Sequence, residues 1–156
     1  MENSLIKFTK DRHYEFAKMY YNWVCDCLTE DKMWEELALF RLGVECPVRQ
    51  NELLSITYLQ INGLYIENVP ILKKYKGQQT QFYYNKVEMS PDTMFVLLRI
   101  WDSNSHPLDK IFKHPMRYYV KRIRTSIGDE RFNGKTISGI GMQFLYDKLC
   151  KSKAEE

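Results

Sequence analysis

The spacing of hydrophobic and polar positions predicts two helices in the first part of the chain. Apolar residues at intervals of three and four, the pattern of a helix with one buried face, run through residues 9–42. In the first helix the expected buried row comprises Phe16, Tyr20, Trp23, Val24 and Cys27. We expect a cap for this helix at Thr9 or Asp11. The second should run from a cap at Thr29 to Gly43, and because the connection is short, the two helices should pack as an antiparallel pair.

The middle of the chain has the β-branched and aromatic composition of strands. The expected strands are residues 53–61, 64–71 and 80–89. Asn62 and Gly63 both tolerate positive φ, which indicates a two-residue hairpin turn, and Gly77 marks a second turn. Pro70 has no backbone N–H and is expected at an edge or a bulge. The pattern therefore predicts an antiparallel three-stranded meander.

Helical spacing returns after Ser90 and Pro91, which predict a helix start because a capping hydroxyl precedes proline at the first helical position. Residues 94–101 are apolar on nearly every side, so we expect a central buried helix, although a buried strand has the same pattern. Further helices are expected at residues 108–114, 115–127 and 137–149, with Gly128 ending the second of them. The sequence thus predicts an α+β fold with an N-terminal helix pair, a small antiparallel three-stranded meander, and C-terminal helices packed against it.

Chain length and composition predict one folded domain over residues 1–156, of which 153–156 form a tail. With 44% hydrophobic and 28% charged residues the chain resembles average globular proteins. No apolar run reaches the roughly 18 residues of a membrane span, and the first residues lack the pattern of a signal peptide. We therefore expect a cytoplasmic protein that does not contact membranes.

The four cysteines are too few and too unevenly spaced for a disulfide framework, and free thiols are expected at Cys25, Cys27, Cys46 and Cys150. Cys25 and Cys27 would lie on nearly opposite faces of a helix, which separates them as metal ligands. No cofactor and no metal are expected.

Charge is distributed unevenly along the chain. Residues 26–36 contain five acidic residues and one basic residue, whereas residues 108–124 contain six basic residues and one acidic residue. We therefore expect a dipolar molecule with a positive face in its C-terminal half.

The clearest functional pattern lies in residues 115–127. One predicted face is apolar, with Met116, Tyr119, Val120, Ile123 and Ile127. Arg117, Lys121 and Arg124 form a basic row on another face, and Tyr118 lies beside it, placed to stack on a base or to lean against an arginine. The row suits phosphate neutralisation, so we expect contact with the backbone of nucleic acid without sequence specificity. The lysines that would extend this footprint like a wing are Lys73, Lys74 and Lys76.

Three other interpretations stay open. In the first, the basic row is simply a helix face exposed to solvent. In the second, the row binds an acidic protein, and the chain acts as an adaptor or inhibitor through a dipolar surface rich in tyrosine. The third is a small hydrolase or nuclease centred on His106 and His114 with Asp109, although each histidine precedes a proline and so resembles a helix-boundary residue. Residues 53–61 carry no basic residue, which argues against a winged-helix reading of DNA sequence.

Overall fold

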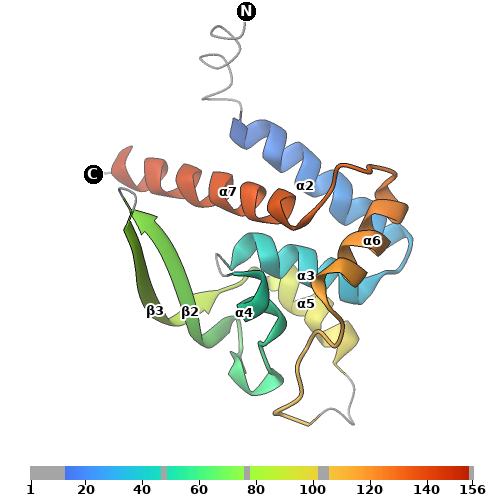
Figure 1. Ribbon diagram of the computed structural model, residues 1–156, viewed down its shortest axis with the longest axis horizontal. Coiled ribbons are helices and arrows are strands. Elements are labelled where there is room, and N and C mark those ends of the chain that lie inside the picture. Colours follow the sequence, from blue (N-terminus) through green and yellow to red (C-terminus); the bar gives the residue numbers. More distant parts are fainter. Residues whose placement is uncertain (1–12, 47–48, 76–77, 102–105, 155–156) are drawn as a thin grey trace, which may run out of the picture.

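The computed structural model describes residues 13–46, 49–75, 78–101 and 106–154, and the side chains of residues 70–85 and 149–154 lie outside this description. The helices are α2 His13–Glu30, α3 Trp34–Glu45, α4 Gln50–Leu54, α5 Pro91–Ile100, α6 Met116–Ile127 and α7 Gly134–Ala154 (Figure 1). The strands, in the order in which they pair, are β1 Ile61–Asn62, β2 Tyr65–Tyr75 and β3 Gln78–Glu88, and both pairings are antiparallel. This arrangement confirms the predicted α+β class and the three-stranded meander.

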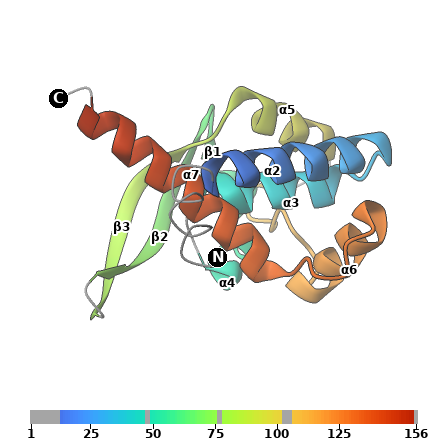
Figure 2. The same ribbon diagram turned by 90° about the horizontal axis from the view of Figure 1, so that it is seen from above.

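Helix α3 is the central element of the fold. It contacts α2, α5, α6 and α7, which lie around it in Figures 1 and 2. Its buried residues are Glu36, Leu37, Ala38, Leu39, Phe40, Leu42 and Val44. The sequence pattern places the central buried helix at residues 94–101 instead, and this is wrong. That segment forms α5, whose outer face leaves Phe95 65% and Leu98 50% exposed.

Two glycines let α3 and α7 approach each other closely. A Cβ on Gly43 would lie 2.5 Å from Cγ2 of Ile137, and one on Gly141 would lie 2.9 Å from the carbonyl oxygen of Val44. The prediction that Gly43 ends the second helix is wrong, because α3 continues to Glu45 and uses this glycine for packing.

Lys32 makes the turn between α2 and α3. Its φ of +55° lies in the left-handed region. The N–H groups of Lys32 and Met33 donate to the carbonyls of Thr29 and Leu28 at 3.0 and 2.9 Å, which is a Schellman-type helix end. Thr29 therefore belongs to the last turn of α2, where its hydroxyl donates to the Cys25 carbonyl. The prediction that Thr29 caps α3 is wrong.

Most of the first predicted strand is wrong. Residues 53–60 comprise the end of α4, a short loop and a 3-10 turn at Tyr58–Gln60, and only Ile61–Asn62 is strand. The apolar residues that suggested a strand are nevertheless used in the core, since Leu53, Ile56 and Tyr58 are buried.

Long-range pairing explains both this difference and the absence of the helix predicted at residues 108–114. The N–H of Tyr58 donates to the Asp109 carbonyl at 3.2 Å, and the N–H of Ile111 donates to the Ile56 carbonyl at 3.0 Å. The two segments satisfy each other's backbone groups in irregular conformations, so neither forms the element that its local pattern predicts.

The first hairpin is present, with its turn one residue later than predicted. Asn62 pairs with Tyr65, so the central residues of the turn are Gly63 and Leu64. Gly63 has a φ of +60°, a conformation that glycine adopts without steric cost.

Strands β2 and β3 form a long hairpin that lies at one end of the molecule. It is at the opposite end from α6 in both views (Figures 1 and 2). Strand β1 pairs only with Tyr65 and Ile66, so at Pro70 β2 is paired with β3 and has no strand on its other side. Pro70 therefore lies at an edge, as predicted. The second predicted turn residue, Gly77, lies outside the described residues.

The ends of the C-terminal helices follow the sequence more closely. Ser90 caps α5 by accepting a hydrogen bond from the Thr93 N–H, and α6 follows Pro115 and ends at Gly128 with φ +72°. Helix α7 is longer than the predicted residues 137–149. Among the helices of the described residues, none has the length and apolar character needed to cross a bilayer.

The described cysteines carry free thiols, as predicted for Cys25, Cys27 and Cys46. Burial raises the pKa of Cys25 to about 11 and that of Cys46 to about 12, so both are held as neutral thiols. The side chain of Cys150 lies outside the described residues.

Candidate functional site

Helix α6 has the two faces that its sequence predicts. Tyr119, Val120, Ile123 and Ile127 are buried in the core, and Met116 is partly buried against it. The exposed residues of the helix are Arg117, Tyr118, Lys121, Arg122, Arg124 and Thr125. The helix contacts both α2 and α3, so packing fixes the position of its exposed face.

The predicted basic row is exposed along α6. Arg117, Lys121 and Arg124 follow one another at i, i+4 and i+7, which places them on one side of the helix. The Nε–H of Arg124 donates to the carbonyl of Phe132, which orients its guanidinium. The side chains of Arg117 and Lys121 make no hydrogen bond or ion pair with another described residue. The row thus offers two uncompensated cations and a third whose position is fixed.

Acidic residues lie against the opposite side of α6. Tyr119, Arg122 and Ser126 are spaced at i, i+3 and i+7, and they contact acidic partners from the segment of residues 26–36. These contacts are Tyr119 to Glu35, Arg122 to Glu36 and Ser126 to Asp31. The acidic and basic segments therefore lie side by side, and charge is separated across one helix rather than between two ends of the molecule.

The acidic contacts remove Arg122 from the free cations. Its Nε–H donates to Glu36 at 2.8 Å, and hydrogen bonding to this carboxylate raises the arginine's pKa further. Burial, followed by its hydrogen bond to Glu35, raises the pKa of Tyr119, so this phenol stays neutral.

Tyr118 lies in a stack of rings at the start of α6. The His114 ring covers it at a centroid distance of 3.9 Å and an interplanar angle of 26°. The Arg122 guanidinium lies 5.5 Å from the Tyr118 ring centroid. Of the two roles predicted for Tyr118, the contact with an arginine is present, and His114 occupies a place where a base was expected. His114 and Tyr118 are both exposed, so this stacked pair of rings lies at the surface at the start of α6.

The two histidines of the hydrolase interpretation, His106 and His114, each have partners within the fold. The backbone N–H of His106 donates to the Asp109 carboxylate at 2.9 Å, and Nδ1 of His106 accepts from the Leu108 N–H at 3.1 Å. These bonds close a turn, while His114 stacks on Tyr118. In the part of the chain that the structure describes, no three His, Cys, Asp or Glu residues are grouped to hold a metal ion.

The strand that contains Lys73 and Lys74 does not lie beside α6. Lys73 and Lys74 belong to β2, their side chains lie outside the description, and Lys76 is outside the described residues altogether. The hairpin and α6 lie at opposite ends of the molecule (Figures 1 and 2). A footprint that included both would have to span its longest axis.

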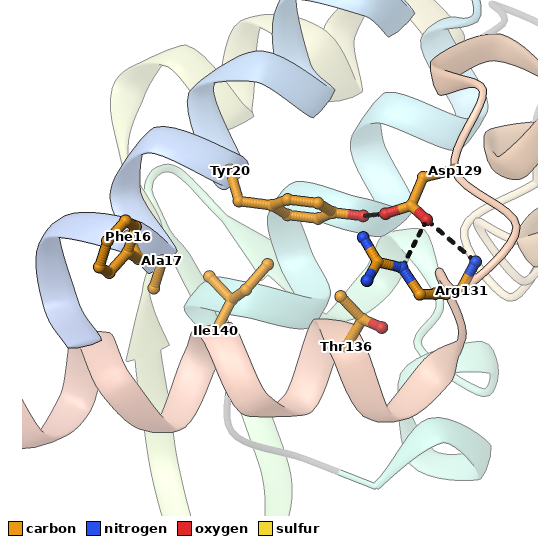
Figure 3. Close-up of a pocket in the computed structure, with 7 residues that line it drawn as sticks. All are labelled: Phe16, Ala17, Tyr20, Asp129, Arg131, Thr136 and Ile140. Carbon is orange, nitrogen blue, oxygen red and sulfur yellow. Dashed lines mark hydrogen bonds and ion pairs between the residues drawn. The ribbon is translucent and has the colours of Figure 1, made fainter. Parts of the chain in front are cut away.

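The sequence did not reveal an open hollow between α2 and α7 (Figure 3). It has a volume of about 520 Å³ and is lined by Phe16, Ala17, Tyr20, Asp129, Arg131, Thr136 and Ile140. Ile140 and Thr136 project towards α2, and the Tyr20 ring lies across the hollow with its hydroxyl directed at Asp129. The apolar wall therefore ends in a polar group.

A hydrogen-bonded carboxylate forms this polar end. Asp129 accepts from the Tyr20 hydroxyl at 3.0 Å and from the backbone N–H of Arg131 at 3.0 Å. The N–H bond from Arg131, with smaller contributions from Tyr20 and the guanidinium, lowers the pKa of Asp129. Asp129 thus stays ionised and offsets the charge of Arg131.

The buried row predicted for α2 is partly wrong, and this explains why the hollow was missed. Phe16 is 56% and Trp23 42% exposed, whereas the side that faces the core carries Tyr21, Val24, Cys25 and Leu28. The spacing of Phe16 and Tyr20 was the available signal, but apolar spacing on a helix does not show which of two apolar sides is covered.

Comparison of the chain with protein-family models, with curated proteins and with solved structures gives no match. Function is therefore inferred from the geometry alone.

Proposed function

We propose that this is a non-enzymatic binding protein whose basic row, Arg117, Lys121 and Arg124, contacts an anionic partner, and that this partner is the backbone of nucleic acid. The observation that carries the proposal is the pair Arg117 and Lys121, two exposed cations without partners among the described residues on a helix packed against the core. Such fixed charges neutralise phosphates and release their counterions on binding.

The row suits backbone contact rather than the reading of sequence. Its side chains are cations, which recognise phosphate oxygens on any sequence. Helix α4, which precedes the hairpin as a recognition helix precedes a wing, contains no basic residue and has only five residues. The His114 ring beside the row adds a surface on which an unpaired base can stack.

A cytoplasmic location belongs to the same proposal. The free thiols of Cys25, Cys27 and Cys46 support it, since reducing compartments keep cysteines unpaired.

Salt dependence of binding tests the proposal. With three phosphate contacts, the logarithm of the association constant for duplex DNA should fall against the logarithm of salt concentration with a slope of about −3. Replacing Arg117 and Lys121 by alanine should make that slope shallower by about 2. The matched control replaces Lys18 and Lys148, two exposed lysines on α2 and α7, and should leave the slope unchanged. A salt-insensitive complex, or equal weakening by both variants, would contradict the proposal.

An acidic protein would contact the same row, and the molecule's exposed tyrosines, Tyr65, Tyr118 and Tyr146, suit interface anchors. Capture of partners from a host extract with and without nuclease separates the two possibilities. Partners released by nuclease support nucleic acid. Retention of the same protein after nuclease, with loss in the Arg117 and Lys121 variant, assigns the row to a protein.

A further inference from the structure

The outer face of α2 carries a row of exposed apolar side chains. Phe16, Met19 and Trp23, at i, i+3 and i+7, are 56%, 66% and 42% exposed, and Tyr20 at i+4 is half-buried beside them. Single exposed apolar residues are common on protein surfaces, but a continuous row on one side of a helix is the form of an interaction surface.

The hollow of Figure 3 continues this row towards α7. Phe16 and Tyr20 belong to both features, and Ala17 with Ile140 extends the apolar surface between the helices. The resulting surface is a ridge on α2 with a depression beside it, into which an apolar side chain of a partner fits.

The other side of the row is acidic. Glu15 and Asp26 are exposed and lie on one side of α2 at i and i+11, and Glu30 is exposed beyond Trp23. Lys18 is the only Lys or Arg in α2, and its ammonium lies over the Tyr14 ring at 5.9 Å, away from the apolar row. At the hollow, Arg131 is offset by Asp129. The outer face of α2 therefore carries negative charge along its apolar row.

We propose that the outer face of α2, together with the hollow beside it, docks an amphipathic helix of a partner protein that has an apolar row flanked by Lys or Arg. The apolar side chains of such a helix would cover Phe16, Met19 and Trp23, and one would enter the hollow. Its basic side chains would face Glu15 and Asp26, which gives the complex an orientation.

A pair of synthetic peptides tests the proposal on the full-length protein. The first is a Leu/Lys amphipathic helix, and the second has glutamate in place of every lysine. The Leu/Lys peptide should bind and shift the amide resonances of α2 and of the first turns of α7 in heteronuclear NMR spectra, whereas the Leu/Glu peptide should not bind. Replacing both Phe16 and Met19 by serine should weaken binding at least about tenfold.

Two further variants distinguish charge-dependent binding at α2 from non-specific binding to exposed apolar residues. Glu15→Lys with Asp26→Lys should lower the affinity for the Leu/Lys peptide and create affinity for the Leu/Glu peptide. Phe95→Ser with Leu98→Ser removes a similarly exposed apolar pair from α5 and should have no effect. Equal binding of both peptides, or equal weakening by the α2 and α5 variants, would overturn the proposal. A dimer in sedimentation velocity that Met19→Ser dissociates would also overturn it, because a second copy of the chain would then be the occupant.

Discussion

Arg122 on α6 donates its Nε–H to Glu36 on α3 at 2.8 Å, and the Glu36 side chain is only 7% exposed. This bond links the helix that carries the basic row to the central helix of the core. It also distinguishes Arg122, whose charge is paired with a carboxylate, from Arg117 and Lys121, whose side chains have no partner among the described residues.

Replacing Arg122 should show how much its bond to Glu36 contributes to stability. Arg122→Ala leaves the Glu36 carboxylate buried without its charged partner and should lower the free energy of unfolding by about 1–3 kcal/mol, measured by urea denaturation. Glu36→Gln in the same chain should recover part of that loss, because the buried group is then neutral. If the double variant is no more stable than Arg122→Ala, the bond does not act in this way.

The left-handed conformation of Lys32 predicts a stabilising substitution. Lys32→Gly should raise the free energy of unfolding by about 0.5–1 kcal/mol, because glycine adopts a positive φ without the clash of a Cβ. The comparison is Gly128→Ala at the end of α6, where φ is +72°. This substitution should lower the free energy of unfolding by about 1 kcal/mol. A destabilised Lys32→Gly protein would show that the lysine side chain contributes more than its backbone costs.

Two glycines of α7 form a matched pair. A Cβ on Gly141 meets the Val44 carbonyl, whereas one on Gly139 meets open space. Gly141→Ala should therefore cost about 1–3 kcal/mol by forcing α7 away from α3. Gly139→Ala should stabilise the protein by up to about 1 kcal/mol through helix propensity. Thermal unfolding of the two variants checks both signs, and equal effects would contradict the close packing.

Stability should fall at alkaline pH. Burial is the main cause that raises the pKa of Tyr20, Tyr21 and Tyr119 above the ordinary value of 10.0. A folded pKa above the unfolded one means that the stabilisation is fully present below pH 10.0 and is lost as the pH rises beyond it, when the unfolded phenols ionise. The buried thiols of Cys25 and Cys46 act in the same direction from a lower pH.

Tyr119→Phe is the test of this pH dependence. It removes one of these phenols together with its bond to Glu35, so the protein should be less stable at neutral pH but should lose less on going to pH 10.5 or so. Urea midpoints at the two pH values give the comparison. An unchanged difference between them would exclude a contribution of Tyr119.

Local patterns predicted the elements whose partners are near in sequence. The faces of α6, its end at Gly128 and the Ser90 cap depend on spacing and on capping groups within a few residues, and the structure has them all. The segment of residues 53–60 failed because its backbone pairs with residues 107–111, which no local pattern reveals.

The candidate site shows the same division. Exposure of Arg117 and Lys121 follows from helix geometry, so the basic row was predictable. The carboxylate that engages Arg122 and the ring that covers Tyr118 come from contacts between elements, and these decide which cations and rings are free.

The long β2–β3 hairpin has a free edge, which bears on whether copies of the protein associate through their sheets. Beyond the two residues that β1 covers, a described edge of β2 presents backbone N–H and C=O groups that another chain could extend into a continuous sheet. Pro70 has no backbone N–H and so removes one donor from this edge, which makes pairing with another chain less favourable.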